Sequence, residues 1–140
     1  MTVNQIFDDT NRLLIKTAGL ERRKAEVIAS NIANLDTPGY QAREFTFTKA
    51  LQRAAGATPA SGLEMRRTNP GHLPAAPALE GVTGTLGMRP RQLGGLDGNS
   101  VNLDQEMAEQ AINNANYLRT LQMLKSKMAI LKNAIVEGGK

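Results

Sequence analysis

Few side chains in this sequence are of the kind that carry out catalysis. The only histidine, His72, lies in a glycine- and proline-rich segment, so we interpret it as a turn residue and not as a general base. Residues 94–99 lack the alternating acidic ligands and the final glutamate of a calcium loop, and they predict a turn. P-loop, dinucleotide-binding and HExxH motifs are absent from the sequence. We therefore predict no catalytic residue, no cofactor, no metal site and no enzymatic activity.

The net positive charge is compatible with an anionic partner but does not by itself indicate one. The 140 residues carry a net charge of +4 and contain no cysteine, which excludes disulfides and thiolate metal sites. The basic runs Arg22-Arg23-Lys24 and Arg66-Arg67 are short and have acidic neighbours, which is typical of solvated faces. No run approaches the length of a membrane span, and the N-terminus lacks the features of a secretory signal. A basic helical hairpin that binds nucleic acid or an anionic surface stays open as an alternative function.

A second group of polar residues has a spacing typical of helix packing. Asn31 and Asn34 lie three residues apart, so on a helix they share a face. A buried amide must find hydrogen-bond partners and thereby fixes the register of packed helices, although two solvated asparagines at a fraying helix end are the alternative. The sequence Thr37-Pro38-Gly39-Tyr40 then predicts a tight turn with proline at its second position and glycine at its third.

The element that must position these asparagines is a long amphipathic helix, predicted from about Gln5 to Leu35. Its apolar stripe consists of Phe7, Leu14, Ala18, Ala25, Ile28, Ile32 and Leu35, with Asn11 and Glu21 at the other positions of the stripe. A second row, on an adjacent face, consists of Ile6, Leu13, Leu20 and Val27. The helix therefore has two sides to bury.

A longer helix is predicted near the other end of the chain. Its apolar seam alternates steps of four and three through Leu103, Met107, Gln110, Asn114, Tyr117, Leu121, Leu124, Met128, Leu131 and Ile135. Asn102 is a candidate N-cap for this helix, with Gln105 three residues later, and Gly138-Gly139 is predicted to end it.

The segment between the two helices has no clear period. Residues 54–100 hold nine of the thirteen glycines and five of the six prolines, so we predict a flexible central segment. Short strands or turns are predicted there at most at residues 81–84 and 88–90. The chain is thus divided into an N-terminal helix (1–37), a turn and extended segment (38–53), the central segment (54–100) and a C-terminal coiled-coil helix (101–137), which form one structural unit.

The predicted fold class is mainly α. The two long terminal helices are expected to pack as an antiparallel coiled-coil hairpin, with the irregular, glycine- and proline-rich central segment between them and chain termini that are disordered in the free monomer. Each helix has more apolar surface than one partner helix covers. That surplus favours assembly over a soluble monomer.

Two motifs resemble a known family. Ile28-Ala29-Ser30-Asn31-Ile32-Ala33-Asn34, followed by Thr37-Pro38-Gly39-Tyr40, resembles the N-terminal signature of bacterial flagellar axial proteins, the rod, hook and hook-associated subunits. Residues 41–45, and residues 97–107 with Asn116-Tyr117 after them, look like the proximal rod subunits. The resemblance covers roughly residues 10–47 and 96–136. The sister rod protein FlgC is the alternative. It differs from this sequence at two places, because its turn carries an insertion and its late helix starts with a VNVVEEM-like sequence.

The resemblance implies a structural subunit of the flagellar basal-body rod, which spans the periplasm and transmits torque from the membrane ring to the hook. Implied partners are further copies of the chain, other rod subunits, the adapter between the rod and the ring, and the flagellar type III export apparatus, which needs no cleaved signal peptide. Neither nucleic acid nor direct membrane insertion is implied.

Two sets of residues are expected to mediate this assembly. The assembly motif consists of Asn31, Ile32, Ala33, Asn34, Thr37, Pro38, Gly39 and Tyr40. The helix-packing seam consists of Leu14, Ala18, Ala25, Ile28, Leu35, Met107, Tyr117, Leu121, Leu124, Met128, Leu131 and Ile135.

Overall fold

The structure, a computed structural model, describes residues 9–54, 81–90 and 97–137. Along the chain they form α2 (Asp9–Ala33), β1 (Arg43–Thr46), α3 (Thr48–Ala54), β2 (Thr85–Met88) and α4 (Leu103–Glu137). The protein is mainly helical, as predicted. The predictions for His72, for Arg66-Arg67, for the chain termini and for most of the central segment lie outside the described residues.

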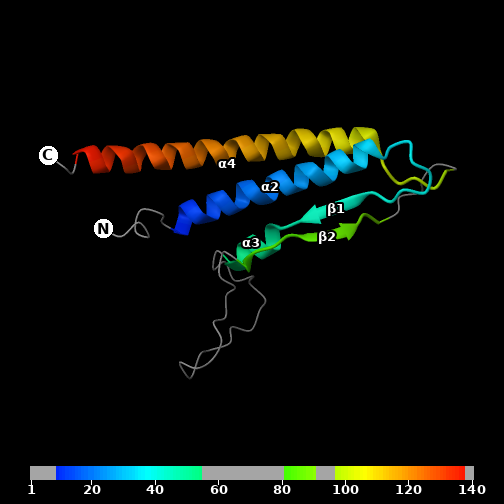
Figure 1. Ribbon diagram of the computed structural model, residues 1–140, viewed down its shortest axis with the longest axis horizontal. Coiled ribbons are helices and arrows are strands. Elements are labelled where there is room, and N and C mark those ends of the chain that lie inside the picture. The colour runs from blue at the N-terminus through cyan, green and yellow to red at the C-terminus, as the bar shows by residue number, and fades with distance from the viewer. Residues whose placement is uncertain (1–8, 55–80, 91–96, 138–140) are drawn as a thin grey trace, which may run out of the picture.

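The two long helices pack side by side and run in opposite directions (Figure 1). Near the end of α2, Asn31 contacts Glu106 at the start of α4, whereas Glu21, earlier in α2, contacts Asn113 and Thr120 farther along α4. The described ends of the chain, Asp9 and Glu137, consequently lie toward one end of the molecule, and the connection after α2 lies at the other (Figure 1). The coiled-coil character of this helix pair stays a prediction.

A two-stranded antiparallel sheet packs beside α2 (Figure 1). Arg43 pairs with Met88 and Thr46 pairs with Thr85. The extended run predicted for residues 41–47 is confirmed by β1. The second strand, at residues 85–88, lies between the two places where short strands or turns were predicted.

A small apolar core lies between α2 and the sheet. Leu20, Phe45 and Val82 are buried there, and Val27, Phe47, Ala50, Leu51 and Ala54 pack against them. The predicted second row of the N-terminal helix is thus confirmed at Leu20 and Val27. Gly84 is required for this packing because a Cβ atom at that position would overlap the ring of Phe45.

The contact between α2 and α4 is more polar than the sequence pattern predicts. The buried residues of α4 are Glu106, Asn113 and Thr120, which lie seven residues apart on one row of the helix. On α2, Ile28 is fully buried and lies with buried Asn11, Glu21 and Asn31. Hydrogen bonds to backbone and side chains allow these polar groups to be buried, so a row of polar residues occupies the centre of the contact.

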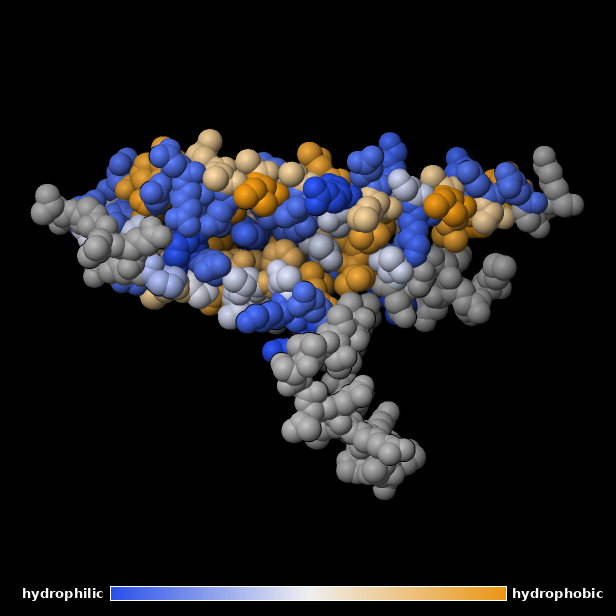
Figure 2. Space-filling model, turned by 180° about the vertical axis from the view of Figure 1, so that it is seen from behind, coloured by the Kyte–Doolittle hydropathy of each residue, from blue (hydrophilic) through white to orange (hydrophobic). Residues whose placement is uncertain are grey.

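The residues of the predicted α4 seam differ in how far they are buried. Tyr117, Leu124, Met128 and Leu131 are half-buried, whereas Met107, Leu121 and Ile135 are exposed. On α2, the predicted seam residues Leu14, Ala18, Ala25 and Leu35 are half-buried. Figure 2 accordingly shows hydrophobic side chains on the outer surface along the length of α4.

Candidate assembly site

The turn after α2 has the geometry that its sequence predicts. The backbone N–H of Tyr40 donates to the carbonyl of Thr37 at 3.2 Å, which closes a four-residue turn around Pro38 and Gly39. Gly39 has a φ of 73°, in the left-handed region that glycine adopts without strain. The turn directs the chain back along α2 into β1.

A second segment, distant in sequence, pairs with this turn. The N–H of Gly39 donates to the carbonyl of Asp97 at 3.0 Å, and the N–H of Ser100 donates to the carbonyl of Tyr40 at 3.0 Å. The N–H of Ala42 donates to Oγ of Ser100 at 2.9 Å. We call residues 31–43 together with residues 97–106 the turn junction. The two parts of the sequence that carry the family resemblance thus form one structure.

Asn99 closes the end of α2 within the turn junction. Its buried Nδ2 donates to the carbonyls of Asn34, Leu35 and Thr37 at 2.9, 2.6 and 2.9 Å, while its Oδ1 accepts from the N–H of Val101 at 2.8 Å. These three carbonyls belong to the turn that follows α2, which ends at Ala33, so this amide caps the turn and holds it against the end of the helix. The sequence analysis placed Asn99 in a turn and missed this role, because the carbonyls that it binds are more than 60 residues away in sequence.

The two asparagines at the end of α2 have different roles. Asn31 is fully buried; its Nδ2 donates to the carbonyl of Arg43 at 2.8 Å and to Oε2 of Glu106 at 3.1 Å, and its Oδ1 accepts from the N–H of Arg43 at 2.9 Å. Asn31 therefore joins α2 to β1 and α4. Asn34 instead bonds locally, to the carbonyl of Ser30 at 2.8 Å.

The other members of the predicted assembly motif lie toward the surface of the turn junction. Thr37 donates from its hydroxyl to Oδ1 of Asn34 at 3.2 Å, and the hydroxyl of Tyr40 donates to Oδ1 of Asn31 at 3.4 Å. The remaining positions of the motif differ in exposure: Ile32 is half-buried, and Ala33, Pro38 and Gly39 are exposed. Whether these residues contact other subunits stays a prediction.

An ion pair connects the sheet to α4 next to Asn31. Arg89, directly after β2, pairs with the fully buried carboxylate of Glu106 and, at 2.9 Å, with Glu109. The Arg89 side chain is 11% exposed, so most of this charge pair is removed from water. Glu109 also lies 4.0 Å from Lys24 of α2. Sequence reasoning did not single out Arg89, because its partners lie on another element.

Apolar residues on the outside of α4 lie next to this network and continue along the helix. Leu103, Met107, Leu118 and Leu121 are 42%, 57%, 64% and 36% exposed, and their spacing places them on one side of the helix. We call these four residues the α4 flank. A helix needs a partner for such a surface, so the α4 flank is a candidate contact for another protein chain.

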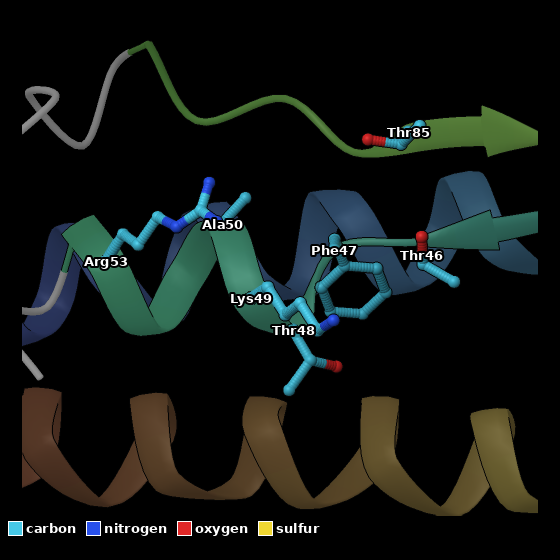
Figure 3. Close-up of a pocket in the computed structure, with 7 residues that line it drawn as sticks. All are labelled: Thr46, Phe47, Thr48, Lys49, Ala50, Arg53 and Thr85. Atoms are coloured by element: carbon cyan, nitrogen blue, oxygen red, sulfur yellow. The ribbon is translucent and has the colours of Figure 1, made fainter. Parts of the chain in front are cut away.

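One hollow among the described residues lies beside α3. This hollow has a volume of about 480 Å³ and is lined by Thr46, Phe47, Thr48, Lys49, Ala50, Arg53 and Thr85 (Figure 3). This lining contains basic and hydroxyl side chains but no carboxylate or histidine. Within the described ranges, no group of three or more metal-ligating side chains occurs, and neither long helix is apolar enough to cross a membrane.

Comparison with known proteins gives the family. Residues 16–41, which contain most of α2 and the turn, match the family model for flagella basal body rod protein. The flagellar basal body rod protein FlgB of Escherichia coli is 36% identical over 136 residues, covering 94% of this chain and 96% of the relative. The chain belongs to the FlgB family of flagellar basal body rod proteins.

Two further FlgB proteins show similar agreement. That of Proteus mirabilis is 34% identical over 132 residues (90% of this chain, 96% of the relative), and that of Salmonella typhimurium is 33% identical over 135 residues (95% and 96%). The resemblance to the proximal rod type is thereby confirmed. None of these FlgB relatives favours the FlgC or nucleic-acid alternatives.

Proposed function

We propose that this chain is a structural, non-enzymatic subunit of the proximal rod of the bacterial flagellum. The observation that carries the proposal is the exposed α4 flank, in a chain that belongs to the FlgB family. In this arrangement, α2 and α4 pair through polar contacts and leave their surplus apolar surface for neighbouring subunits. Contacts between unlike surfaces extend helically without closing, which suits a rod.

The turn junction serves this function as the rigid part of the subunit. Asn31, Asn99 and Glu106 fix the direction in which the chain leaves α2 and the register of α4 beside it. A rod that transmits torque between the membrane ring and the hook needs subunits with a single defined shape. We propose that the predicted assembly motif contributes to rod contacts through this geometry, with Pro38 and Gly39 at the surface.

The small apolar core is consistent with export before assembly. Among the described residues, only a few are buried between α2 and the sheet, so little burial opposes the conformational entropy gained when this part of the chain opens. We propose that the chain leaves the cell through the flagellar type III apparatus without a cleaved signal. In the rod, its partners are further copies of itself, other rod subunits and the adapter to the membrane ring.

An aspartate placed in the α4 flank tests the proposed function. Leu118→Asp and Leu121→Asp should each abolish incorporation into the rod and swimming while secretion of the chain continues, because burying an unpaired charge against a neighbour is costly. Incorporation is measured by immunoblotting of isolated basal bodies, and swimming in soft agar.

Ser126→Asp is the matched control for these variants, because it adds the same charge to an exposed position of the same helix that points away from the α4 flank. It should swim normally. If cells with Leu118→Asp and Leu121→Asp swim as well as this control, the α4 flank has no part in assembly.

A further inference from the structure

A groove between α2, β1 and α4 holds an acidic residue that the turn junction does not use. It has a volume of about 270 Å³. The residues that line it are Glu21, Lys24, Glu44, Phe45, Thr46, Phe47, Thr48, Ile112, Asn113 and Asn116. We call it the Glu21 groove. It combines carboxylates with aromatic and aliphatic side chains, so it suits a partner that is both cationic and apolar.

The Glu21 carboxylate is buried and only half satisfied. Its Oε1 accepts a hydrogen bond from the Thr120 hydroxyl at 3.4 Å, whereas Oε2 has no hydrogen-bond partner among the described residues. Burial raises the pKa of Glu21. The Thr120 hydrogen bond and the charge of Arg119 lower this pKa, but by less than burial raises it. A buried carboxylate oxygen without a donor is costly, so a cationic donor at this position would be favourable.

The charged groups of the same chain around Glu21 leave this oxygen without a hydrogen bond. Lys24, which also lines the groove, lies 4.0 Å from Glu109. Arg119, one residue before Thr120 on α4, attracts Glu21 through its charge but is exposed, and within the described residues it donates no hydrogen bond to Glu21. Glu44 adds a second negative charge to the lining. The groove therefore remains suited to a cation from outside the chain.

The same chain carries a matching surface farther along α4. Lys125 and Lys132 are exposed, lie seven residues apart on one side of the helix and make no ion pair within the described residues. Leu121 and Ile135 are exposed on the neighbouring side of the helix. This surface is cationic and apolar, as the Glu21 groove requires, and the net charge of +4 leaves lysines available for such contacts.

We propose that the Glu21 groove of one copy receives a lysine from the Lys125–Lys132 side of α4 of a second copy. In this contact the lysine ammonium pairs with the Glu21 carboxylate, and the apolar stem of the lysine packs on Phe45, Phe47 and Ile112. This inference rests on the proposed rod assembly and names the contact between successive copies within it.

The positions of the two surfaces on α4 determine how successive copies are arranged. The α4 residues of the groove, 112–116, lie about 15 residues before the lysines, which is roughly 20 Å along a helix at about 1.5 Å per residue. Because the two surfaces differ, each copy offers one of them to the next copy, and the series does not close on itself. Successive copies are then staggered by roughly that distance along the axis of α4.

Disulfide crosslinking tests the contact directly, because the chain has no cysteine of its own. Ile112→Cys places a thiol in the groove, and Ala129→Cys places one between the two lysines; both positions are exposed. Cells that make both variants together are used to isolate basal bodies, which are oxidised and separated on non-reducing gels. We expect a dimer with this pair and loss of the dimer when Ile130→Cys, which is also exposed but on a different side of α4, replaces Ala129→Cys.

A second set of variants separates the lysines from Arg119. The double change Lys125→Glu and Lys132→Glu should abolish the crosslink, whereas Arg119→Gln should leave it unchanged. The inference is overturned if both cysteine variants enter the rod without crosslinking, if Ile130→Cys crosslinks equally well, or if only Arg119→Gln removes the dimer. Absence of the unmodified chain from basal bodies would instead overturn the proposed rod function.

Discussion

At the scale of single residues, two asparagine side chains form hydrogen bonds with backbone groups that other backbone groups would satisfy in a helix or a sheet. Asn99 satisfies three carbonyls at the end of α2, and Asn31 exchanges hydrogen bonds with both backbone groups of Arg43 as a neighbouring strand would. An amide suits both positions because it carries a donor and an acceptor on one planar group. Neither aspartate nor leucine could replace it without leaving backbone groups unpaired.

Removing the Asn99 amide should destabilise the chain. In Asn99→Ala the carbonyls of Asn34, Leu35 and Thr37 in the turn after α2 lose their donor, and we expect a loss of about 2 kcal/mol in the free energy of unfolding. The measurement is urea unfolding of the purified chain, followed by circular dichroism.

The control for this prediction is Asn114→Ala, which changes an exposed asparagine on α4 and should alter stability by less than about 0.5 kcal/mol. If Asn99→Ala unfolds at the same urea concentration as Asn114→Ala, the turn junction does not depend on this cap.

At the scale of elements, the sequence predicted what local patterns determine. The second row of α2, with Leu20 and Val27, the turn at Pro38 and Gly39, and the extended run around Phe45 follow from periodicity and backbone preference, and the structure contains all three. The N-cap at Asn102 follows in the same way, since the N–H of Gln105 donates to its Oδ1 at 3.2 Å.

Contacts between distant elements could not be predicted in this way. The seam of α4 was read from its apolar residues, but the row that faces α2 centres on Glu106, Asn113 and Thr120. Each of these polar residues is buried because its partner lies on another element, and a periodic pattern contains no information about that partner. Arg89 was missed for the same reason.

The polar row of the helix pair predicts an unusual pH dependence at Glu21. Because burial raises the pKa of this carboxyl, the folded chain holds the proton more tightly than the unfolded chain does. The resulting stabilisation is complete below the unfolded pKa and is lost as the pH rises through the folded pKa. Glu21→Gln, which has the same shape without the charge, should therefore be more stable than the unmodified chain at neutral pH.

This advantage of Glu21→Gln should shrink as the pH falls from about 7 to about 4, where the glutamate is protonated as well. Urea unfolding of both chains across this range provides the comparison, and Glu26→Gln, at an exposed position of α2, serves as the control. A constant difference in stability between Glu21→Gln and the unmodified chain at all pH values would show that the buried charge is not the cause.

At the scale of the whole molecule, one ion pair joins the sheet to the helices. Arg89 follows β2 and pairs with Glu106 of α4, which in turn accepts a hydrogen bond from Asn31 of α2. Three layers thus meet at one buried carboxylate. We expect this connection to make the sheet and the helix pair unfold together.

Arg89→Met should uncouple them. Glu106 would keep a buried charge without its main partner, at a cost of about 3 kcal/mol, and the amides of β1 and β2 should exchange with deuterium roughly a hundredfold faster. Hydrogen exchange read by mass spectrometry or NMR measures this effect. Adding Glu106→Gln to Arg89→Met should restore part of the protection, because no uncompensated charge remains. Unchanged exchange in Arg89→Met would mean that the sheet is held by its apolar core alone.

The antiparallel helix pair also gives the subunit a head and a tail. The turn junction lies at one end, and both described chain ends lie toward the other (Figure 1). A filament of such units in head-to-tail order inherits this polarity, so its two tips are chemically different. Newly arriving copies can then recognise one tip and ignore the other, without any additional marker of direction.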